Sequence, residues 1–176
     1  MADSIGIKKH QVGAHTAPAK STATILLVDD DSLVLEFLSD YLKDDYCIVT
    51  ASSGEEAISR MGSHEADIAL VDIKMPGMDG LETIEKLNAI DQDLVTIIMT
   101  GFPTVDSSVR AIKLGASDYI LKPFKLNEVS RSISMAVAER ELRREMKHLK
   151  ERVSMLERGI ASRRDNIKVN KKLNNA

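Results

Sequence analysis

The alternation of short apolar runs with helical patterns is the feature that most constrains the fold of this 176-residue chain. Five runs predict β-strands: Ile25 to Val28, Cys47 to Thr50, Ile68 to Val71, Val95 to Met99 and Tyr119 to Leu121. Helical patterns lie between them: Leu33 to Leu42, Glu55 to Met61, Leu81 to Asn88 and Val105 to Leu114, with a fifth from about Asn127. Strands this apolar are typical of a parallel sheet covered by helices on both faces.

Boundary signals agree with this division. Ser52 followed by Glu55 has the spacing of a capping box, and Gly62 and Gly115 stand where helices are expected to stop. Residues 1–22 are polar, small and aperiodic, so we expect a disordered leader before a folded domain over residues 23–140.

The composition excludes several classes of protein. Cys47 is the only cysteine, so neither an internal disulfide nor a cysteine-rich metal site is expected. Its apolar surroundings predict a buried, inert thiol. No segment approaches the ~18 apolar residues of a membrane span, and the N-terminus lacks the apolar core of a signal peptide. We therefore expect a cytoplasmic protein that makes no membrane contact.

Polar residues follow four of the five predicted strands. They are Asp29-Asp30-Asp31 after the first strand, Asp72 after the third, Thr100-Gly101 after the fourth and Lys122-Pro123 after the fifth. The carboxyl ends of parallel strands share one rim, where open α/β sheets bind their ligands. Each residue alone could be a helix cap, a turn residue or a solvated charge, but together they predict one functional site.

Carboxylates crowded at this rim should recruit a cation. Two such charges ~4 Å apart repel by about 4 kcal/mol at an effective dielectric constant near 20. A set of oxygen ligands without histidine or thiolate favours Mg²⁺ over Zn²⁺. With the Lys122 ammonium and the Thr100 hydroxyl added, the site suits a phosphoryl group.

The motifs ILLVDDD, LVDIKMPGMDG, IIMTG and DYILKPF, in this order and spacing, resemble the receiver domain of two-component response regulators. The resemblance covers roughly residues 23–140. It implies a doubly wound, flavodoxin-like α/β fold with a five-stranded parallel sheet in the order 2-1-3-4-5. It also implies that Asp72 accepts a phosphoryl group from a sensor histidine kinase or a phosphotransfer protein. Such a chain is a signalling domain in a phosphorelay, not an enzyme, although it assists its own Mg²⁺-dependent phosphorylation and dephosphorylation.

The same resemblance implies a set of metal ligands. Asp30, Asp72 and the backbone carbonyl of Lys74 would bind Mg²⁺ directly, and Asp29 would act mainly through water. Pro76, Gly77 and Gly80, which follow in the same loop, are interpreted as turn residues and not as ligands.

The resemblance further implies which groups hold the phosphoryl oxygens. They are the Thr100 hydroxyl, the Lys122 ammonium and the backbone N–H groups of Lys74 and Gly101. Thr100 and Tyr119 would move as switch residues and reshape the surface of the fourth helix, fifth strand and fifth helix. The Lys122–Pro123 peptide bond is expected to be cis.

The segment after the resemblance is periodic. Its apolar residues are spaced alternately four and three apart: Leu142, Met146, Leu149, Val153, Leu156 and Ile160. This is the seam of a coiled coil, with the leucines at d positions. In a parallel pair Glu145 faces Lys150 of the partner, and Arg152 faces Glu157, so both cross-pairs attract. Residues 141–160 therefore predict a helical extension that forms a homodimer.

Two alternatives remain open. The extension could instead be a single helix folded back on its own domain. The chain could also be the receiver and linker of a longer DNA-binding or enzymatic regulator. Residues 161–176 are basic, but they lack aromatics and any recognisable motif. We expect a solvated tail there and no direct binding of nucleic acid.

Overall fold

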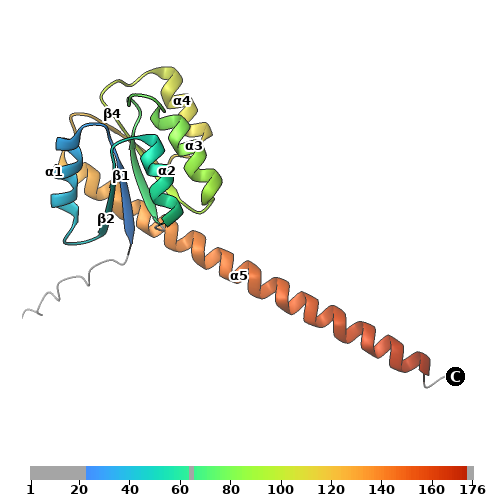
Figure 1. Cartoon of the computed structure of the whole chain (residues 1–176). Helices are drawn as coiled ribbons and strands as arrows, with labels where there is room; N and C mark the ends of the chain where they lie inside the picture. The colour runs from blue at the N-terminus through green and yellow to red at the C-terminus, as the bar shows by residue number, and fades with distance from the viewer. Residues whose placement is uncertain (1–22, 64–65, 174–176) are drawn as a thin grey trace, which may run out of the picture.

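The computed structural model describes residues 23–63 and 66–173. The predicted leader, residues 1–22, lies outside this range. Within it, five strands alternate with five helices, as predicted (Figure 1). The strands are β1 (Thr24–Val28), β2 (Cys47–Ala51), β3 (Ile68–Asp72), β4 (Val95–Thr100) and β5 (Asp118–Leu121). The helices are α1 (Ser32–Leu42), α2 (Gly54–Ser63), α3 (Gly80–Ile90), α4 (Val105–Lys113) and α5 (Leu126–Leu173).

The sheet is parallel throughout, with the strand order β2-β1-β3-β4-β5, which confirms the predicted fold class. Its register aligns the carboxyl ends of the strands. Asp72 at the end of β3 pairs with Met99, and Thr100 at the end of β4 pairs with Leu121. The residues that follow the strands therefore meet along one rim.

Two apolar layers hold the helices to the sheet. Alternate residues of each strand point to opposite faces, so Ile25 and Leu27 of β1 belong to one layer, and Leu26 and Val28 to the other. Helices α1 and α5 cover the first face, and α2, α3 and α4 cover the second (Figure 1). Because both faces are covered, the strands read as nearly continuous apolar runs.

The predicted start and end of α2 are corrected by the structure. The helix begins at Gly54, so the Ser53 hydroxyl accepts the Glu56 backbone N–H, 3.2 Å away, and the Ser52–Glu55 pairing was wrong by one residue. The Glu56 carboxylate accepts hydrogen bonds from both the backbone N–H and the hydroxyl of Ser52, which lower the pKa of Glu56 to about 2. Gly62 lies inside the helix and does not end it.

The prediction that Gly115 ends a helix was correct. Gly115 follows the last residues of α4 with a φ of 75°, a left-handed conformation that favours glycine.

The prediction of a buried thiol was wrong, because Cys47 is exposed. It is the first residue of β2, which is an edge strand of the sheet.

Helix α5 crosses the predicted domain boundary at residue 140 without a break. Its first turns pack on the sheet through Val129, Ile133 and Ala136, which are fully buried. Beyond them it projects away from the domain in one direction and continues past Ile160 (Figure 1). The alternative of an arm folded back on its own domain is therefore not what the structure has.

None of the helices in the described ranges is long and apolar enough to cross a membrane.

Gly77 and Gly80, between β3 and α3, are required for two different reasons. Gly77 has a φ of 77°, as a turn residue requires. Gly80 starts α3, and its N–H donates to the Ile73 carbonyl, 3.0 Å away. A Cβ at Gly80 would lie only 1.9 Å from the backbone carbonyl oxygen of Asp72. This glycine therefore allows α3 to begin directly against the strand end that carries Asp72.

We predict that Gly80→Ala lowers the free energy of unfolding by about 1–3 kcal/mol, because backbone must shift to admit the methyl group. Gly62→Ala is the matched control. Its Cβ would meet no atom within 4 Å, and it lies inside a helix, so it should stabilise the domain by about 0.4–1 kcal/mol. Urea unfolding of both variants measures the difference, and a Gly80→Ala protein as stable as wild type would contradict the close approach.

Candidate functional site

The turn after β1 places one aspartate inward and the next outward. The Asp29 backbone N–H donates to the Ala51 carbonyl, 3.2 Å away, and its Oδ1 accepts the Asp31 N–H at 3.0 Å. Asp31 in turn caps α1 by accepting the Leu33 N–H at 2.9 Å. Asp29 is consequently fully buried, whereas Asp30 is exposed.

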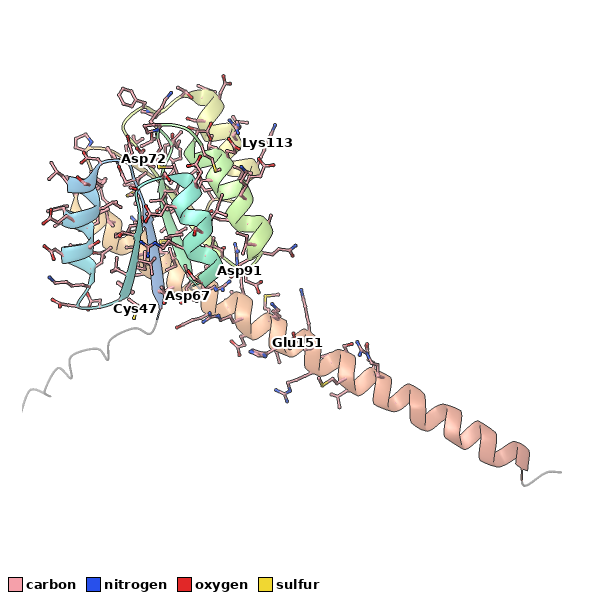
Figure 2. The ribbon with its side chains drawn as sticks, viewed as in Figure 1. Cys47, Asp67, Asp72, Asp91, Lys113 and Glu151 are labelled. Carbon is pink, nitrogen blue, oxygen red and sulfur yellow. The ribbon has the colours of Figure 1, made fainter. Side chains whose placement is uncertain are left out.

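The predicted carboxylates come together at this rim. Asp29, Asp30 and Asp72 each offer an oxygen within 4.8 Å of the others. Asp72 is 6% exposed at the end of β3, which makes its carboxylate reachable from only a small opening. Figure 2 shows it at the end of the domain farthest from the projecting part of α5.

Lys122 is the cation of the cluster. Its backbone N–H donates to the Thr100 carbonyl, 2.8 Å away, which holds the residue beside the end of β4. The Nζ atom lies 2.5 Å from Asp29 Oδ2 and 3.3 Å from Asp72 Oδ2. The peptide bond to Pro123 is cis, as predicted. The direct ion pair with Asp29 was not predicted, because sequence spacing shows that the two residues share a rim but not which charges touch.

Burial and neighbouring charges shift the pKa values of both Asp72 and Lys122. Burial raises the pKa of Asp72 above its usual value, and the charge of Asp29 adds to the rise, while Lys122 and the Lys74 backbone N–H oppose it. Burial alone would lower the pKa of Lys122, but its hydrogen bond to Asp29 and the charges of Asp29 and Asp72 raise it. The charged form of Lys122 is thus favoured, whereas the charged form of Asp72 is disfavoured by its surroundings.

The remaining predicted site residues lie around this cluster. Thr100 is fully buried, and its Oγ1 accepts the Phe102 N–H, 3.1 Å away. A Cβ at Gly101 would meet only the Lys122 Cβ, at 3.8 Å. Tyr119 is half-buried, and its hydroxyl lies 3.3 Å from the hydroxyl of Ser107 in α4. The roles of these residues and of the Lys74 carbonyl stay predictions.

The residues present fit a divalent cation. Three carboxylates face one ammonium, which leaves two negative charges uncompensated when all are ionised. Asp72 Oδ1 is buried and has no hydrogen-bond partner among the described residues. A buried acceptor without a hydrogen-bond partner is costly unless a ligand satisfies it. Oxygen donors of this kind suit a hard ion such as Mg²⁺.

We predict that Asp72→Asn raises the free energy of unfolding at neutral pH when divalent cations are absent, because the buried charge is removed. The pKa of Asp72 is raised in the folded state, so its favourable contribution is complete below the ordinary value of 3.8 and is lost as the pH rises through the folded-state pKa. The variant's advantage should therefore shrink toward acid pH.

Urea unfolding across this pH range measures the effect, with Asp45→Asn, an exposed aspartate outside the cluster, as the control. An advantage of Asp72→Asn that stayed constant with pH would show that the carboxylate is not under electrostatic strain.

Comparison with known proteins identifies the family. The response regulator receiver domain matches residues 25–134. The regulatory protein AtoC of Escherichia coli is 30% identical over 131 residues, which cover 74% of this chain and 28% of AtoC. This chain therefore spans less than a third of that relative's length.

Solved structures agree. A CheY-like receiver domain protein from Methanospirillum hungatei superposes with a TM-score of 0.68 at 30% identity, covering 70% of this chain and 99% of that one. The response regulator TrrA of Thermotoga maritima, in complex with Mg²⁺-BeF, gives a TM-score of 0.60 at 30% identity, over 65% of this chain and 99% of its own. The chain belongs to the response regulator receiver family of two-component signal transduction.

Proposed function

We propose that this chain is a phosphorylation-controlled signalling protein in which Asp72 accepts a phosphoryl group from a phosphohistidine of a sensor kinase or a phosphotransfer protein. The observation that carries the proposal is the state of the Asp72 carboxylate. One of its oxygens is buried with no hydrogen-bond partner among the described residues, and the other lies 3.3 Å from the Lys122 ammonium. A carboxylate held in this way is a candidate nucleophile.

The transfer is a displacement at phosphorus. An Asp72 oxygen forms a bond to the phosphoryl group as the bond between phosphorus and the histidine nitrogen breaks, and the imidazole leaves. The Lys122 ammonium is placed to neutralise charge on the phosphoryl oxygens. The product is an acyl phosphate on Asp72.

A metal ion completes the proposal. Asp29, Asp30 and Asp72, with the Lys74 carbonyl, would hold Mg²⁺, whose chemical contribution is to neutralise the phosphoryl oxygens during transfer. The Mg²⁺-BeF complex of TrrA, a related receiver, supports this assignment. This chain would assist its own modification and would not turn over a separate substrate, and we place it in the cytoplasm with its kinase.

The switch would begin at Thr100. Its hydroxyl accepts the Phe102 N–H in this structure, so reaching a phosphoryl oxygen requires that bond to change. Tyr119 would follow, because the contact of its hydroxyl with that of Ser107 is long, at 3.3 Å. A swing from 1:99 to 99:1 needs about 5.5 kcal/mol, which two such bonds supply only in part. We therefore propose a partial switch that a partner or dimerisation completes.

Phosphorylation by a small acyl-phosphate donor with Mg²⁺ tests the proposal, read by intact mass. Wild type should gain one phosphoryl group, and Asp72→Asn should gain none, because an amide is a far poorer nucleophile. Asp31→Asn is the matched control, since Asp31 neighbours the cluster but its side chain caps α1, and it should label like wild type. Stable label on folded Asp72→Asn at the wild-type level would place the acceptor elsewhere.

The output that we propose is a homodimer through α5. The seam residues are half to two-thirds exposed: Leu142, Met146, Leu149, Val153, Leu156 and Ile160. The side of the helix that touches the domain carries Arg140, Arg144 and Lys147. Arg144 and Met146 are two residues apart, which is about 200° around the helix axis. The seam thus faces away from the domain, where a second copy can pack without displacing it.

Sedimentation equilibrium tests the dimer. Leu149→Glu places two like charges in a d layer and should yield monomers at micromolar concentration. Glu145→Lys should weaken the dimer more mildly, because it faces Lys150, and adding Lys150→Glu should restore it by recreating the attractive pair. Each protein is measured with and without phosphorylation. A monomeric wild type in both states would overturn the coiled-coil proposal.

A second candidate function is favoured by the relatives, of which this chain spans 28% in AtoC and 27% in a ZraR protein. In that case α5 would be the linker between the receiver and a further DNA-binding or enzymatic domain. The intact mass of the protein purified from its native source distinguishes the two candidates.

A further inference from the structure

The nature of the contact between α5 and the domain changes at Ala136. Up to that residue the helix is held by buried apolar side chains, and the half-buried Val137 next to it also packs on the core. From there to Ile160, the only buried side chain among those described is that of Arg140. The next turns instead touch the domain through polar groups: Glu139 with Ser117, Arg140 with Asp91, Arg143 with the Leu94 carbonyl, Arg144 with Asp67 and Lys147 with Asp93.

Asp67 is the centre of these contacts. It is 7% exposed and lies immediately before β3. Its Oδ2 accepts the Thr24 backbone N–H at 2.9 Å, while its Oδ1 lies 2.5 Å from Arg144 Nη2 and 3.5 Å from Arg140 Nε. Its backbone also bonds both neighbouring strands, donating to the Thr24 carbonyl and accepting the Val95 N–H. Both carboxylate oxygens are therefore fixed, and the residue joins three strand starts to α5.

Arg140 depends on this arrangement. It is 7% exposed, and its Nη2 lies 2.8 Å from Asp91 Oδ2. Its Nε and Nη1 have no hydrogen-bond partner among the described residues. The buried guanidinium is thus compensated mainly by the charges of Asp67 and Asp91, and losing one of them would leave it poorly paired, which is strongly unfavourable.

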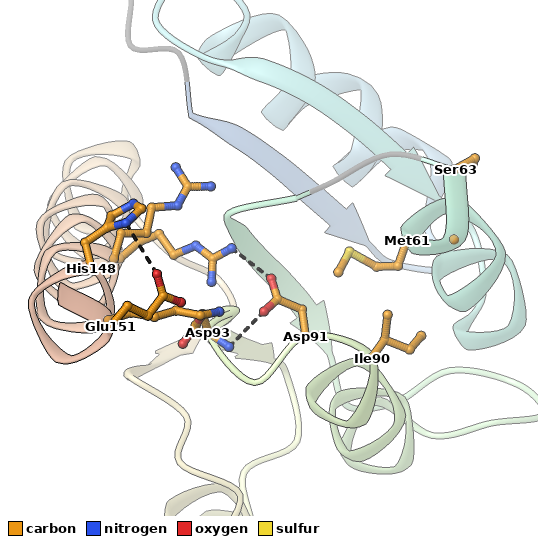
Figure 3. Close-up of a pocket in the computed structure, with 11 residues that line it drawn as sticks. Met61, Ser63, Ile90, Asp91, Asp93, His148 and Glu151 are labelled. Atoms are coloured by element: carbon orange, nitrogen blue, oxygen red, sulfur yellow. Dashed lines mark hydrogen bonds and ion pairs between the residues drawn. The ribbon is translucent and has the colours of Figure 1, made fainter. Parts of the chain in front are cut away.

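The outer part of the contact borders a hollow of about 680 Å³ between the ends of α2 and α3 and the side of α5. Figure 3 shows Met61 and Ile90 on one wall and His148 and Glu151 on the other, with Asp91 and Asp93 between them. Apolar packing does not bridge this space. Lys147 reaches across to Asp93 at 2.9 Å, and its hydrogen bond lowers the pKa of Asp93, so the carboxylate stays charged.

We propose that Asp67, Asp91 and Asp93 form an electrostatic clamp that keeps α5 helical and attached to the domain from Ala136 to Lys147, and that sets the point beyond which an unpaired arm unwinds. Isolated helices are marginal in water, and most helical stability in proteins comes from tertiary contacts. Beyond Lys147 a single arm has few such contacts with its own domain. Fraying from its end should therefore stop where the clamp begins.

The clamp also bears on the proposed dimer, and this part rests on the proposed function. Leu142 and Met146, the first two residues of the seam, lie within the clamped turns. A partner therefore meets a first heptad that is already helical, which reduces the ordering needed to pair. Loss of the clamp should weaken the dimer without changing any residue of the seam.

Amide hydrogen exchange of the full chain tests the clamp. Leu149→Glu serves as the background, so that pairing of two arms cannot supply the protection, whether or not wild type dimerises. In this background, protection should extend through Lys147 and fall beyond it. Adding Asp67→Asn should speed exchange between Arg140 and Lys147 by at least about tenfold, while the amides of β3 and β4 keep their protection.

Glu85→Gln is the matched control, since it removes the same charge from an exposed site on α3 outside the clamp, and it should change nothing. Arg144→Gln provides a second test, because it removes a contact of the clamp but leaves the strand starts intact. If Asp67→Asn also loses protection in β3 and β4, the exchange rates of Arg144→Gln show whether the clamp protects α5. Wild-type exchange rates in Arg144→Gln, or a background in which protection already ends at Ala136, would overturn the clamp.

Discussion

Charge crowding at the ends of parallel strands is the constraint on which the rest of this structure depends. The register of the sheet brings Asp29, Asp30 and Asp72 within reach of one another, and the Lys122 ammonium opposes their repulsion. A carboxylate buried in such surroundings is poorly solvated and incompletely bonded. A cation or a phosphoryl group would satisfy such a carboxylate, so the energetic cost of burying Asp72 supports its proposed role as the phosphoryl acceptor.

The surrounding backbone is shaped to keep this arrangement. Gly80 allows α3 to start against the Asp72 carbonyl, and the Lys122 N–H is tied to Thr100. The hydroxyls of Thr100 and Tyr119, by contrast, are each held by one weak or local partner. This difference in anchoring is what the proposed switch requires, with Asp72 fixed as the acceptor and Thr100 and Tyr119 free to change partners.

The sequence predicted the elements and the rim well, because both follow from local patterns. Apolar runs of three to five residues mark the strands, and the topology of a parallel sheet then brings Asp72, Thr100 and Lys122 together without further information. Properties that depend on residues far apart in the sequence were harder to predict. The Lys122–Asp29 ion pair depends on side-chain reach, and the exposure of Cys47 depends on β2 being an edge strand. Neither property is local.

The clamp was missed for a related reason. Arg140, Arg144 and Lys147 follow one another at helical spacing, so a basic stripe on one side of α5 could have been noticed. Its acidic partners, however, come from the turns before β3 and β4, and each of them looks like an ordinary loop residue. The alternative in which the extension folds back on its own domain through its apolar seam was wrong. The side of α5 that faces the domain is the basic stripe, and the seam lies on the opposite side.

Because α5 is long, a small change of its direction at Lys147, where it leaves the domain, moves its far end a long way. We call this point the root of the helix. From Lys147 to Leu173 the helix extends for about 40 Å at 1.5 Å per residue. A rotation of about 10° at the root would therefore carry the far end through roughly 7 Å, more than one helical turn of 5.4 Å. In the paired state that we propose, where the arm stays helical beyond Lys147, displacements at the strand starts that are too small to matter inside the domain would become large at its tip.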